Sequence, residues 1–119
     1  MGNPFVHVEL MTTDTGKTKA FYGQLFDWQL EDTPMPAGAY TMIKVGSGTG
    51  GGIMANPIPD APSSWVPYVG VDDVKAATEK ANKLGAKVMK EITEIPNMGS
   101  FSIITDPAGA MLGLWQSKT

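Results

Sequence analysis

Apolar and polar residues alternate at the start of the chain, from Phe5 to Thr12. A period of two is typical of a strand that turns one face toward a core. The apolar face of this strand carries Val6, Val8 and Leu10. The opposite face carries His7, Glu9 and Met11. Because two of its residues can titrate, this second face is a candidate functional surface.

After Thr12 the period becomes helical. Asp14 suits a helix N-cap, because its carboxylate can accept from the free N–H groups of the first turn. The expected helix runs to Phe26, and its inward face is predicted to consist of Thr18, Phe21, Tyr22 and Leu25. Strands are expected over residues 28–32 and 40–45, with a loop at 34–38 between them.

The glycine-rich run at residues 46–52 contains a formal G-x-G-x-x-G match. A dinucleotide-binding loop requires a helix directly after the glycines, and residues 53–57 do not favour one. The lysine of a P-loop is also absent from the run. We therefore expect a hairpin loop that enters a short strand.

The same order of elements restarts after a proline-containing linker at residues 56–64. The pattern predicts a strand over 65–71, a helix capped by Asp72 or Asp73, and a strand over 87–92. This second helix is expected to end at Gly85 and to turn inward Val74, Ala77, Ala81 and Leu84.

A hairpin is expected at the end of the second half. Asp106, Pro107 and Gly109 occupy the first, second and fourth positions of a four-residue turn, an order typical of a type I turn. Apolar runs that favour strands lie on both sides of it, at residues 101–105 and 110–115.

Aligning Asp14 with Asp73 registers the two halves at an offset of 59 residues. At this offset Leu25 falls on Leu84, which indicates an internal repeat. We expect an α+β fold in which two tandem β-α-β-β-β modules form a half-open curved barrel with a central cleft. A single domain over residues 1–119 is expected, with module one at about 4–56 and module two at about 64–117.

Composition narrows the function classes. The formal net charge is −3 and no basic stripe is present, so we expect no nucleic-acid partner. No segment has the length and apolarity of a membrane span, and the first residues lack the pattern of a signal peptide, so we expect a cytoplasmic protein without membrane contact. The chain contains no cysteine, which removes thiolate metal ligands and cysteine nucleophiles.

Three motifs in this order resemble the vicinal oxygen chelate superfamily, also called the glyoxalase/bleomycin resistance/dioxygenase family. The motifs are Val6-His7-Val8 followed by Asp14 and Phe21-Tyr22, the segment from Val69 to Asp73 that leads into an alanine-rich helix, and Asp106-Pro107-Ala108-Gly109. The resemblance covers essentially the whole chain, and within the family it is strongest to small single-domain members of uncharacterised function.

The resemblance implies a divalent metal site made by two residues from each module. The corresponding positions in this sequence are His7, Met54, Val66 and Gly113. An imidazole is a metal ligand, whereas an alkyl group and a bare glycine are not, and a thioether suits only soft metals. We therefore expect no metal and no cofactor in this chain.

His7 and Glu9 share a strand face, with their side chains roughly 6–7 Å apart along the strand. Such a pair can transfer protons as catalytic residues, or it can be a structural pair that satisfies a buried carboxylate. The sequence leaves both possibilities open.

Further residues with the same inward direction are candidates for binding a ligand: Met11, Met54, Val66, Tyr68, Gly113 and Trp115. Aromatic rings suit stacking on a planar or cationic molecule, and thioethers adapt to varied apolar shapes. Ordinary core packing explains the same residues equally well.

Two functions follow from these patterns. The preferred hypothesis is a metal-free protein that binds a small apolar or cationic organic molecule, as the resemblance to drug-binding resistance proteins implies. The alternative is an enzyme of the lyase, isomerase or dioxygenase type that uses His7 and Glu9, with or without a metal. A homodimer is expected in either case, because family members usually cover their sheet edges with a second subunit.

Overall fold

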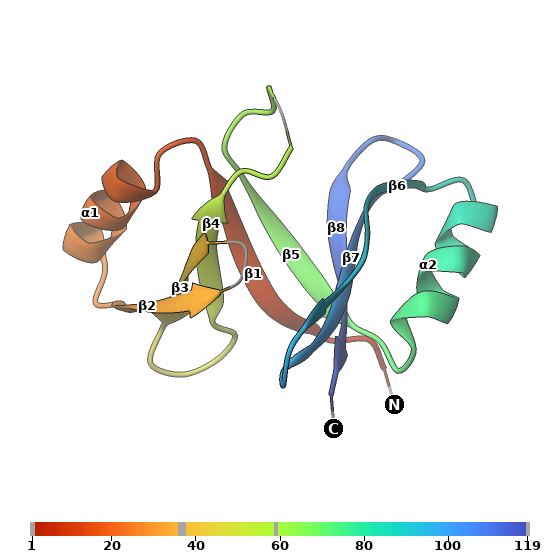
Figure 1. The fold of residues 1–119 in the computed structure, drawn as a ribbon, viewed down its shortest axis with the longest axis horizontal. Helices are drawn as coiled ribbons and strands as arrows, with labels where there is room; N and C mark the ends of the chain where they lie inside the picture. The colour runs from red at the N-terminus through yellow and green to blue at the C-terminus, as the bar shows by residue number, and fades with distance from the viewer. Residues whose placement is uncertain (1, 36–37, 59, 119) are drawn as a thin grey trace. The chain divides into compact units, whose positions relative to one another are not determined.

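A computed structural model describes residues 2–35, 38–58 and 60–118 of the chain. Eight strands and two helices are present within these residues (Figure 1). Their order and bounds are β1 (Phe5–Thr12), α1 (Thr15–Leu25), β2 (Gln29–Met35), β3 (Gly38–Lys44), β4 (Gly51–Ala55), β5 (Ser64–Gly70), α2 (Val74–Lys83), β6 (Lys87–Ile95), β7 (Gly99–Thr105) and β8 (Met111–Ser117).

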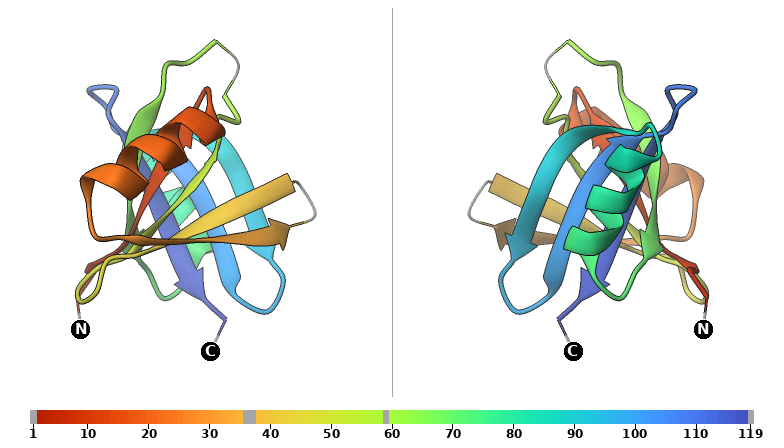
Figure 2. Two further views of the ribbon diagram at one scale, coloured as in Figure 1. Left: turned by 90° about the vertical axis from the view of Figure 1, so that its left-hand side faces the viewer. Right: turned by 90° about the vertical axis from the view of Figure 1, so that its right-hand side faces the viewer.

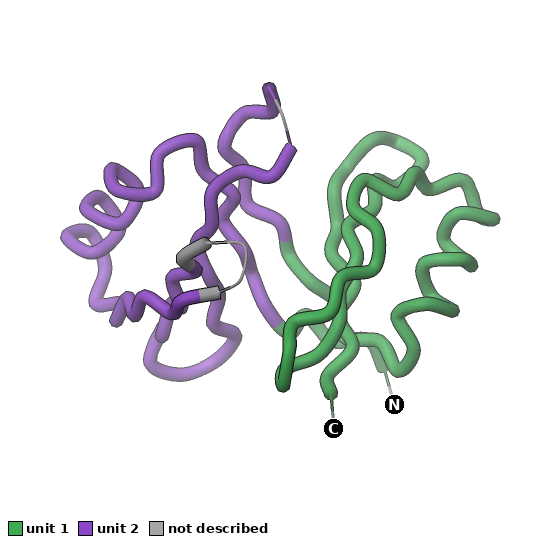
Figure 3. Tube along the Cα trace, viewed as in Figure 1, with its two compact units in different colours: residues 1–6, 67–119 green, residues 7–66 purple. Residues whose placement is uncertain are grey.

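The chain divides into two compact units, coloured separately in Figure 3. Unit 2 contains residues 7–66, and unit 1 contains residues 1–6 together with 67–119. The first six residues lie with the second half of the chain, where Gly70 donates a backbone hydrogen bond to Pro4 at 2.9 Å.

The two units repeat one topology. In unit 2 the strand order is β2-β3-β4-β1, and in unit 1 it is β6-β7-β8-β5. In each case the first and last strands of the module pair in parallel, β1 with β4 and β5 with β8. The prediction of an α+β fold built from two β-α-β-β-β modules is confirmed, and the β1 bounds agree with the predicted strand.

Helix α1 lies against one face of the unit 2 sheet (Figure 2, left). Asp14 caps it as predicted, since its carboxylate accepts from the Lys17 N–H at 3.0 Å. The core under the helix consists of buried Leu10, Ile43 and Ile53, with the partly buried side chains of Tyr22, Trp28, Leu30 and Val45 packed against them.

The predicted inward face of α1 is half wrong. Tyr22 packs on the core, whereas Phe21 and Leu25 are 58% and 55% exposed, and the helix contains no buried residue. Polar contacts hold part of the helix instead: the Lys19 ammonium lies 3.1 Å from both carboxylate oxygens of Asp32 on β2. The helical spacing of the apolar residues predicted the helix correctly, but it did not show which of these residues pack against the sheet.

Helix α2 lies across β6, β7 and β8 in unit 1 (Figure 2, right). Asp73 caps it, and Val74 packs with Ile104 and Leu114 in a buried core. The predicted inward position of Leu84 is wrong, because this residue is the C-cap and is 71% exposed. Gly85 follows with φ +105°, the left-handed conformation that ends a helix.

The last hairpin has the predicted turn. The Gly109 N–H donates to the Asp106 carbonyl at 2.9 Å, and the Asp106 carboxylate accepts from the N–H groups of Ala108 and Ala110. These bonds fix the register of β7 on β8 through the whole length of the pair, from Gly99 opposite Ser117 to Thr105 opposite Met111.

The remaining differences concern strand ends. Strand β2 extends to Met35 and so takes in the first residues of the predicted loop at 34–38, of which residues 36–37 lie outside the described residues. Strand β6 continues to Ile95, beyond the predicted end at 92. The glycine-rich run leads into β4, so the predicted loop that enters a short strand is confirmed.

Within residues 2–35, 38–58 and 60–118, neither helix combines the length and apolarity that a bilayer span requires.

Candidate functional site

The face of the unit 2 sheet opposite α1 carries the polar candidates. Glu9 on β1 is level with Gly52 on β4, and Gly52 is level with Met42 on β3. Because side chains alternate along a strand, the residues two positions away share this face. We call it the helix-free face of unit 2, and it consists of His7, Glu9, Met11, Tyr40, Met42, Gly52 and Met54.

Tyr40 links the two titratable residues of this face. Its hydroxyl lies 2.7 Å from Nε2 of His7, and it also makes a hydrogen bond with Glu9. A hydroxyl has one proton, and the carboxylate can only accept it. The proton arrangement that satisfies all three groups is therefore His7 Nε2–H to the Tyr40 oxygen and Tyr40 O–H to Glu9.

Gly52 makes room for this arrangement. A Cβ atom at position 52 would overlap the Tyr40 hydroxyl, so only glycine lets the tyrosine lie across β4 toward β1. Glu9 is 6% exposed, and burying a carboxylate is costly unless hydrogen bonds satisfy it. By making room for the Tyr40 hydroxyl, Gly52 thereby supplies a hydrogen-bond partner for the buried Glu9 on the neighbouring strand.

Burial shifts the pKa values of His7 and Tyr40. Desolvation lowers the pKa of His7 below its ordinary value of 6.5, which favours a neutral imidazole at pH 7. The pKa of Tyr40 is raised, first by desolvation, then by the negative charge of Glu9 and by its hydrogen bond to that carboxylate. The site therefore combines a neutral imidazole, an un-ionised phenol and one buried carboxylate.

Methionines form the other end of the helix-free face. Met11 is fully buried and is level with Met54 on the adjacent strand β4. Val66, at the end of unit 2, is also fully buried. The predicted ligand-binding residues of unit 2 thus include two neighbouring thioethers on the face that carries the His7–Tyr40–Glu9 group.

In unit 1 the predicted residues gather on the sheet face opposite α2. Tyr68 is level with Gly113 across the β5–β8 pair, and Trp115 follows on the same face of β8. The Tyr68 ring lies directly over Gly113, where a Cβ would overlap it, and meets the Phe101 ring edge-on at 6.0 Å between centroids. Tyr68 is 4% exposed, so packing accounts for its position.

The four family positions do not fit a divalent metal site. His7 offers an imidazole that is engaged with Tyr40, Met54 offers a thioether and Val66 an alkyl group. At Gly113 the space that a side chain would need is filled by the Tyr68 ring. Across residues 2–35, 38–58 and 60–118, no group of three His, Cys, Asp or Glu side chains is placed to hold a metal ion.

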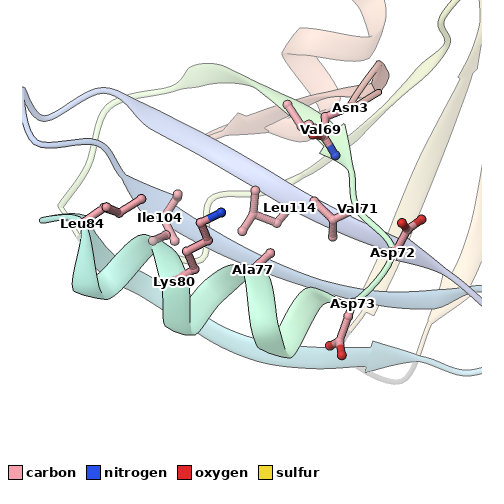
Figure 4. A pocket seen from close by; sticks show the side chains of 11 residues that line it. Asn3, Val69, Val71, Asp72, Asp73, Ala77, Lys80, Leu84, Ile104 and Leu114 are labelled. Carbon is pink, nitrogen blue, oxygen red and sulfur yellow. The ribbon is translucent and has the colours of Figure 1, made fainter. Parts of the chain in front are cut away.

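Two surface hollows lie in unit 1. The larger, about 440 Å³, runs between α2 and strands β5 and β8, with apolar walls, the Lys80 ammonium along its length and carboxylates at one end (Figure 4). None of the predicted site residues lines it. The smaller, about 270 Å³, has Trp115 in its wall beside Pro4, Val6 and Gly70.

Sequence reasoning found His7 and Glu9 but missed Tyr40 and Gly52. Tyr40 lies 33 residues from His7, and their contact depends on how β1, β3 and β4 pair, which no local pattern encodes. The sequence indicates this contact only weakly. Tyr40 lies in a predicted strand, and Gly52 lies in the strand that separates it from β1.

The comparisons with known proteins agree with this architecture. The model of the glyoxalase/bleomycin resistance protein/dioxygenase superfamily matches residues 5–114. The chain belongs to this superfamily.

Two named relatives match most of this chain. A protein of Mycobacterium bovis named "Putative glyoxylase CFP32" is 40% identical over 93% of this chain, and the anthracycline biosynthesis protein DnrV of Streptomyces peucetius is 24% identical over 91%. The chain spans 44% and 45% of the lengths of these relatives.

Among solved structures, the protein BH1468 of Bacillus halodurans superposes with a TM-score of 0.74 at 13% identity, over 100% of this chain and 97% of that one. Methylmalonyl-CoA epimerase from Mycobacterium tuberculosis gives 0.70 at 14% identity, over 97% of this chain and 88% of that one. These similarities show the fold.

We expect Gly113→Ala to destabilise the protein by about 1–3 kcal/mol, because the added methyl group overpacks against the buried Tyr68 ring. Urea unfolding monitored by circular dichroism measures the change. The matched control is Gly23→Ala on the exposed surface of α1, where the new Cβ meets only Leu30 at an ordinary 3.7 Å. That control is expected to gain roughly 0.5–1 kcal/mol from its helix propensity, and equal effects of the two changes would contradict the packing described for Tyr68.

Stability is expected to fall as the pH drops from about 7 toward 5, partly through His7. The unfolded chain takes up a proton at this residue near its ordinary pKa of 6.5, whereas the folded protein resists it to a lower pH. The unfolded state therefore binds more protons across this window, and acid favours it. His7→Gln keeps an N–H donor but does not titrate, so its free energy of unfolding should fall less over the same window. An identical fall in both proteins would show that the protons bind elsewhere.

Proposed function

We propose that this chain binds a small organic molecule, mostly apolar and carrying a positive charge or a hydrogen-bond donor, without a divalent metal. The observation that carries the proposal is the His7–Tyr40–Glu9 group on a face otherwise lined by methionine. The position that corresponds to a family metal ligand, His7, is here part of a hydrogen-bonded group that needs no metal.

The buried carboxylate supports the choice of ligand charge. Glu9 is 6% exposed, so when it is ionised a nearby cation or hydrogen-bond donor gains more from its charge than it would in water. An anionic ligand would be repelled by the same charge. The partly exposed methionines Met42 and Met54 supply an adaptable apolar surface beside it, with the buried Met11 level with Met54 on the adjacent strand.

The residues proposed for unit 1 fit this function less directly. Tyr68 and Gly113 fill one another's space, which supports a packing role for both. Trp115 is partly exposed and lines the smaller hollow, and we propose it as an aromatic binding residue within unit 1 itself. The predicted single domain, homodimer and cytoplasmic location remain predictions.

An enzyme is the second candidate, and the hydrogen-bonded chain from His7 through Tyr40 to Glu9 is the observation that favours it. A neutral imidazole linked to a carboxylate can take a proton from a carbon acid. A 40% identical relative is named as a glyoxylase, which supports testing this activity. Incorporation of deuterium from heavy water into a panel of carbon acids, present in the wild type and lost in Tyr40→Phe, would favour the enzyme.

We expect a cationic aromatic dye, thioflavin T, to bind more tightly than the anionic anilinonaphthalene sulfonate. Glu9→Gln keeps an acceptor for Tyr40 but removes the charge, and it should weaken thioflavin T binding by about tenfold. The control is Glu31→Gln, an exposed carboxylate that pairs with Lys44 at 2.7 Å on the same sheet. Fluorescence titration gives the dissociation constants. Equal affinity of wild type and Glu9→Gln for both dyes would remove Glu9 from the proposed site.

We expect added Zn²⁺, Mn²⁺ or Ni²⁺ to leave the Tm of untagged protein unchanged, because the family positions offer one imidazole and no hard oxygen donor. Thermal unfolding with and without each ion, together with elemental analysis, measures this. A ligand that binds only the folded state must raise Tm by mass action. A rise in Tm, or near-stoichiometric metal that His7→Ala removes, would overturn the metal-free proposal and favour a metalloenzyme.

A further inference from the structure

Unit 1 contains a hollow that the proposed ligand site does not use. It lies between α2 and strands β5 and β8, and its volume is about 440 Å³. None of the residues proposed for ligand binding lines it. We call it the α2 hollow (Figure 4). Its volume falls within the range of small-molecule sites in proteins.

The α2 hollow exists because the helix covers only part of its sheet. Helix α2 packs on β6, β7 and β8, and the side of the helix that borders the hollow carries the small side chains of Ala77 and Ala81. On the sheet, Val69 of β5 is level with Leu114 of β8. Val71 follows two positions after Val69 and therefore shares its face. These side chains form an apolar floor that gains free energy when a hydrocarbon group covers it.

Opposite charges lie at two places along this floor. Asp72 and Asp73 lie at the end of the hollow where α2 begins, and the Lys80 ammonium lies further along it (Figure 4). The seven residues from Asp73 to Lys80 correspond to about 10 Å along a helix. A ligand whose cationic and anionic ends are about that far apart therefore matches both charges.

Both charges are available to a ligand. In the part of the chain that the structure describes, neither Asp72 nor Lys80 belongs to an ion pair, and the ion pairs found there lie in unit 2. Asp73 differs, because its carboxylate already accepts from the Ala76 N–H at 3.1 Å as the helix N-cap. Asp72 is therefore the carboxylate that can pair with a cation, and Lys80 can pair with an anion.

We propose that the α2 hollow binds an elongated zwitterionic organic molecule, with its ammonium group at Asp72, its hydrocarbon chain on the apolar floor and its carboxylate at Lys80. This goes beyond the proposed function, which concerns the helix-free face of unit 2. A purely anionic amphiphile leaves Asp72 unpaired, and a purely cationic one leaves Lys80 unpaired. Because both charges are exposed, each pairing contributes modestly, and the apolar floor supplies much of the affinity.

The test uses straight-chain probes of equal chain length: 8-aminooctanoate, octanoate and octylamine. NMR titration of isotope-labelled protein at physiological salt locates each probe and gives its dissociation constant. The zwitterion 8-aminooctanoate is expected to bind with a dissociation constant of about 1 mM and to shift the amide signals of Val71, Ala77 and Ala81. Octanoate and octylamine each lack one charge and should bind about three- to fivefold more weakly.

Neutral variants separate the two ends of the site. Lys80→Gln should weaken 8-aminooctanoate binding about three- to fivefold and leave octylamine unchanged. Asp72→Asn should weaken it by a similar factor and leave octanoate unchanged. The matched controls are Lys83→Gln and Glu79→Gln, which remove exposed charges of α2 that do not line the hollow and should leave all affinities unchanged. Circular dichroism confirms that each variant is folded.

The proposal is overturned if the zwitterion binds no more tightly than the other two probes, or if no saturable shift appears along α2 up to about 10 mM probe. Shifts confined to Trp115 would place the probe in the smaller hollow, and shifts confined to Met42 and Met54 would place it on the helix-free face of unit 2. Either of these results also overturns it. Thioflavin T binding by Glu9→Gln tests the proposed function separately, so failure of the α2 hollow leaves that function standing.

Discussion

The burial of one carboxylate is the constraint on which the helix-free face of unit 2 depends. Glu9 is 6% exposed, and burying an ionised carboxylate is costly unless hydrogen bonds satisfy it, as the Tyr40 hydroxyl does here. Tyr40 reaches it only because Gly52 has no side chain, and His7 completes the hydrogen bonding of the same hydroxyl. Three strands must therefore pair in one register for this single charge to be tolerated.

In each module a tyrosine ring lies over a glycine of a neighbouring strand, but the two rings make different contacts. In unit 1 the Tyr68 ring closes over Gly113 and packs against Phe101, which gives an apolar contact with no titratable group. In unit 2 the ring over glycine belongs to Tyr40, and its hydroxyl links two titratable side chains, His7 and Glu9. The repeated topology determines where the strands lie. The side chains differ between the modules, and the hydrogen-bonded His7–Tyr40–Glu9 group belongs to the first module.

Local patterns predicted most of the fold. The Asp14 cap, the α2 cap (predicted as Asp72 or Asp73) and the turn at Asp106 each rest on contacts within a few residues and were predicted correctly. The strand from Phe5 to Thr12 was also predicted correctly, from the alternation of its apolar and polar residues. Burial was less predictable: Phe21 and Leu25 have helical spacing yet face outward. Tyr40 escaped notice because its partners lie on other strands, and strand pairing is a property of the whole chain.

The offset of 59 residues that relates the modules places Tyr68 where the first module has Glu9. One half of a duplicated architecture thus has an aromatic ring at the position where the other half has a buried carboxyl group. A chain assembled from two copies of the first module would bury two carboxylates and bear the desolvation cost twice, whereas two copies of the second would have none. The repeat is kept in the strand order and in the Asp14 and Asp73 helix caps, whereas the side chains of the helix-free faces differ, so the two halves are not interchangeable.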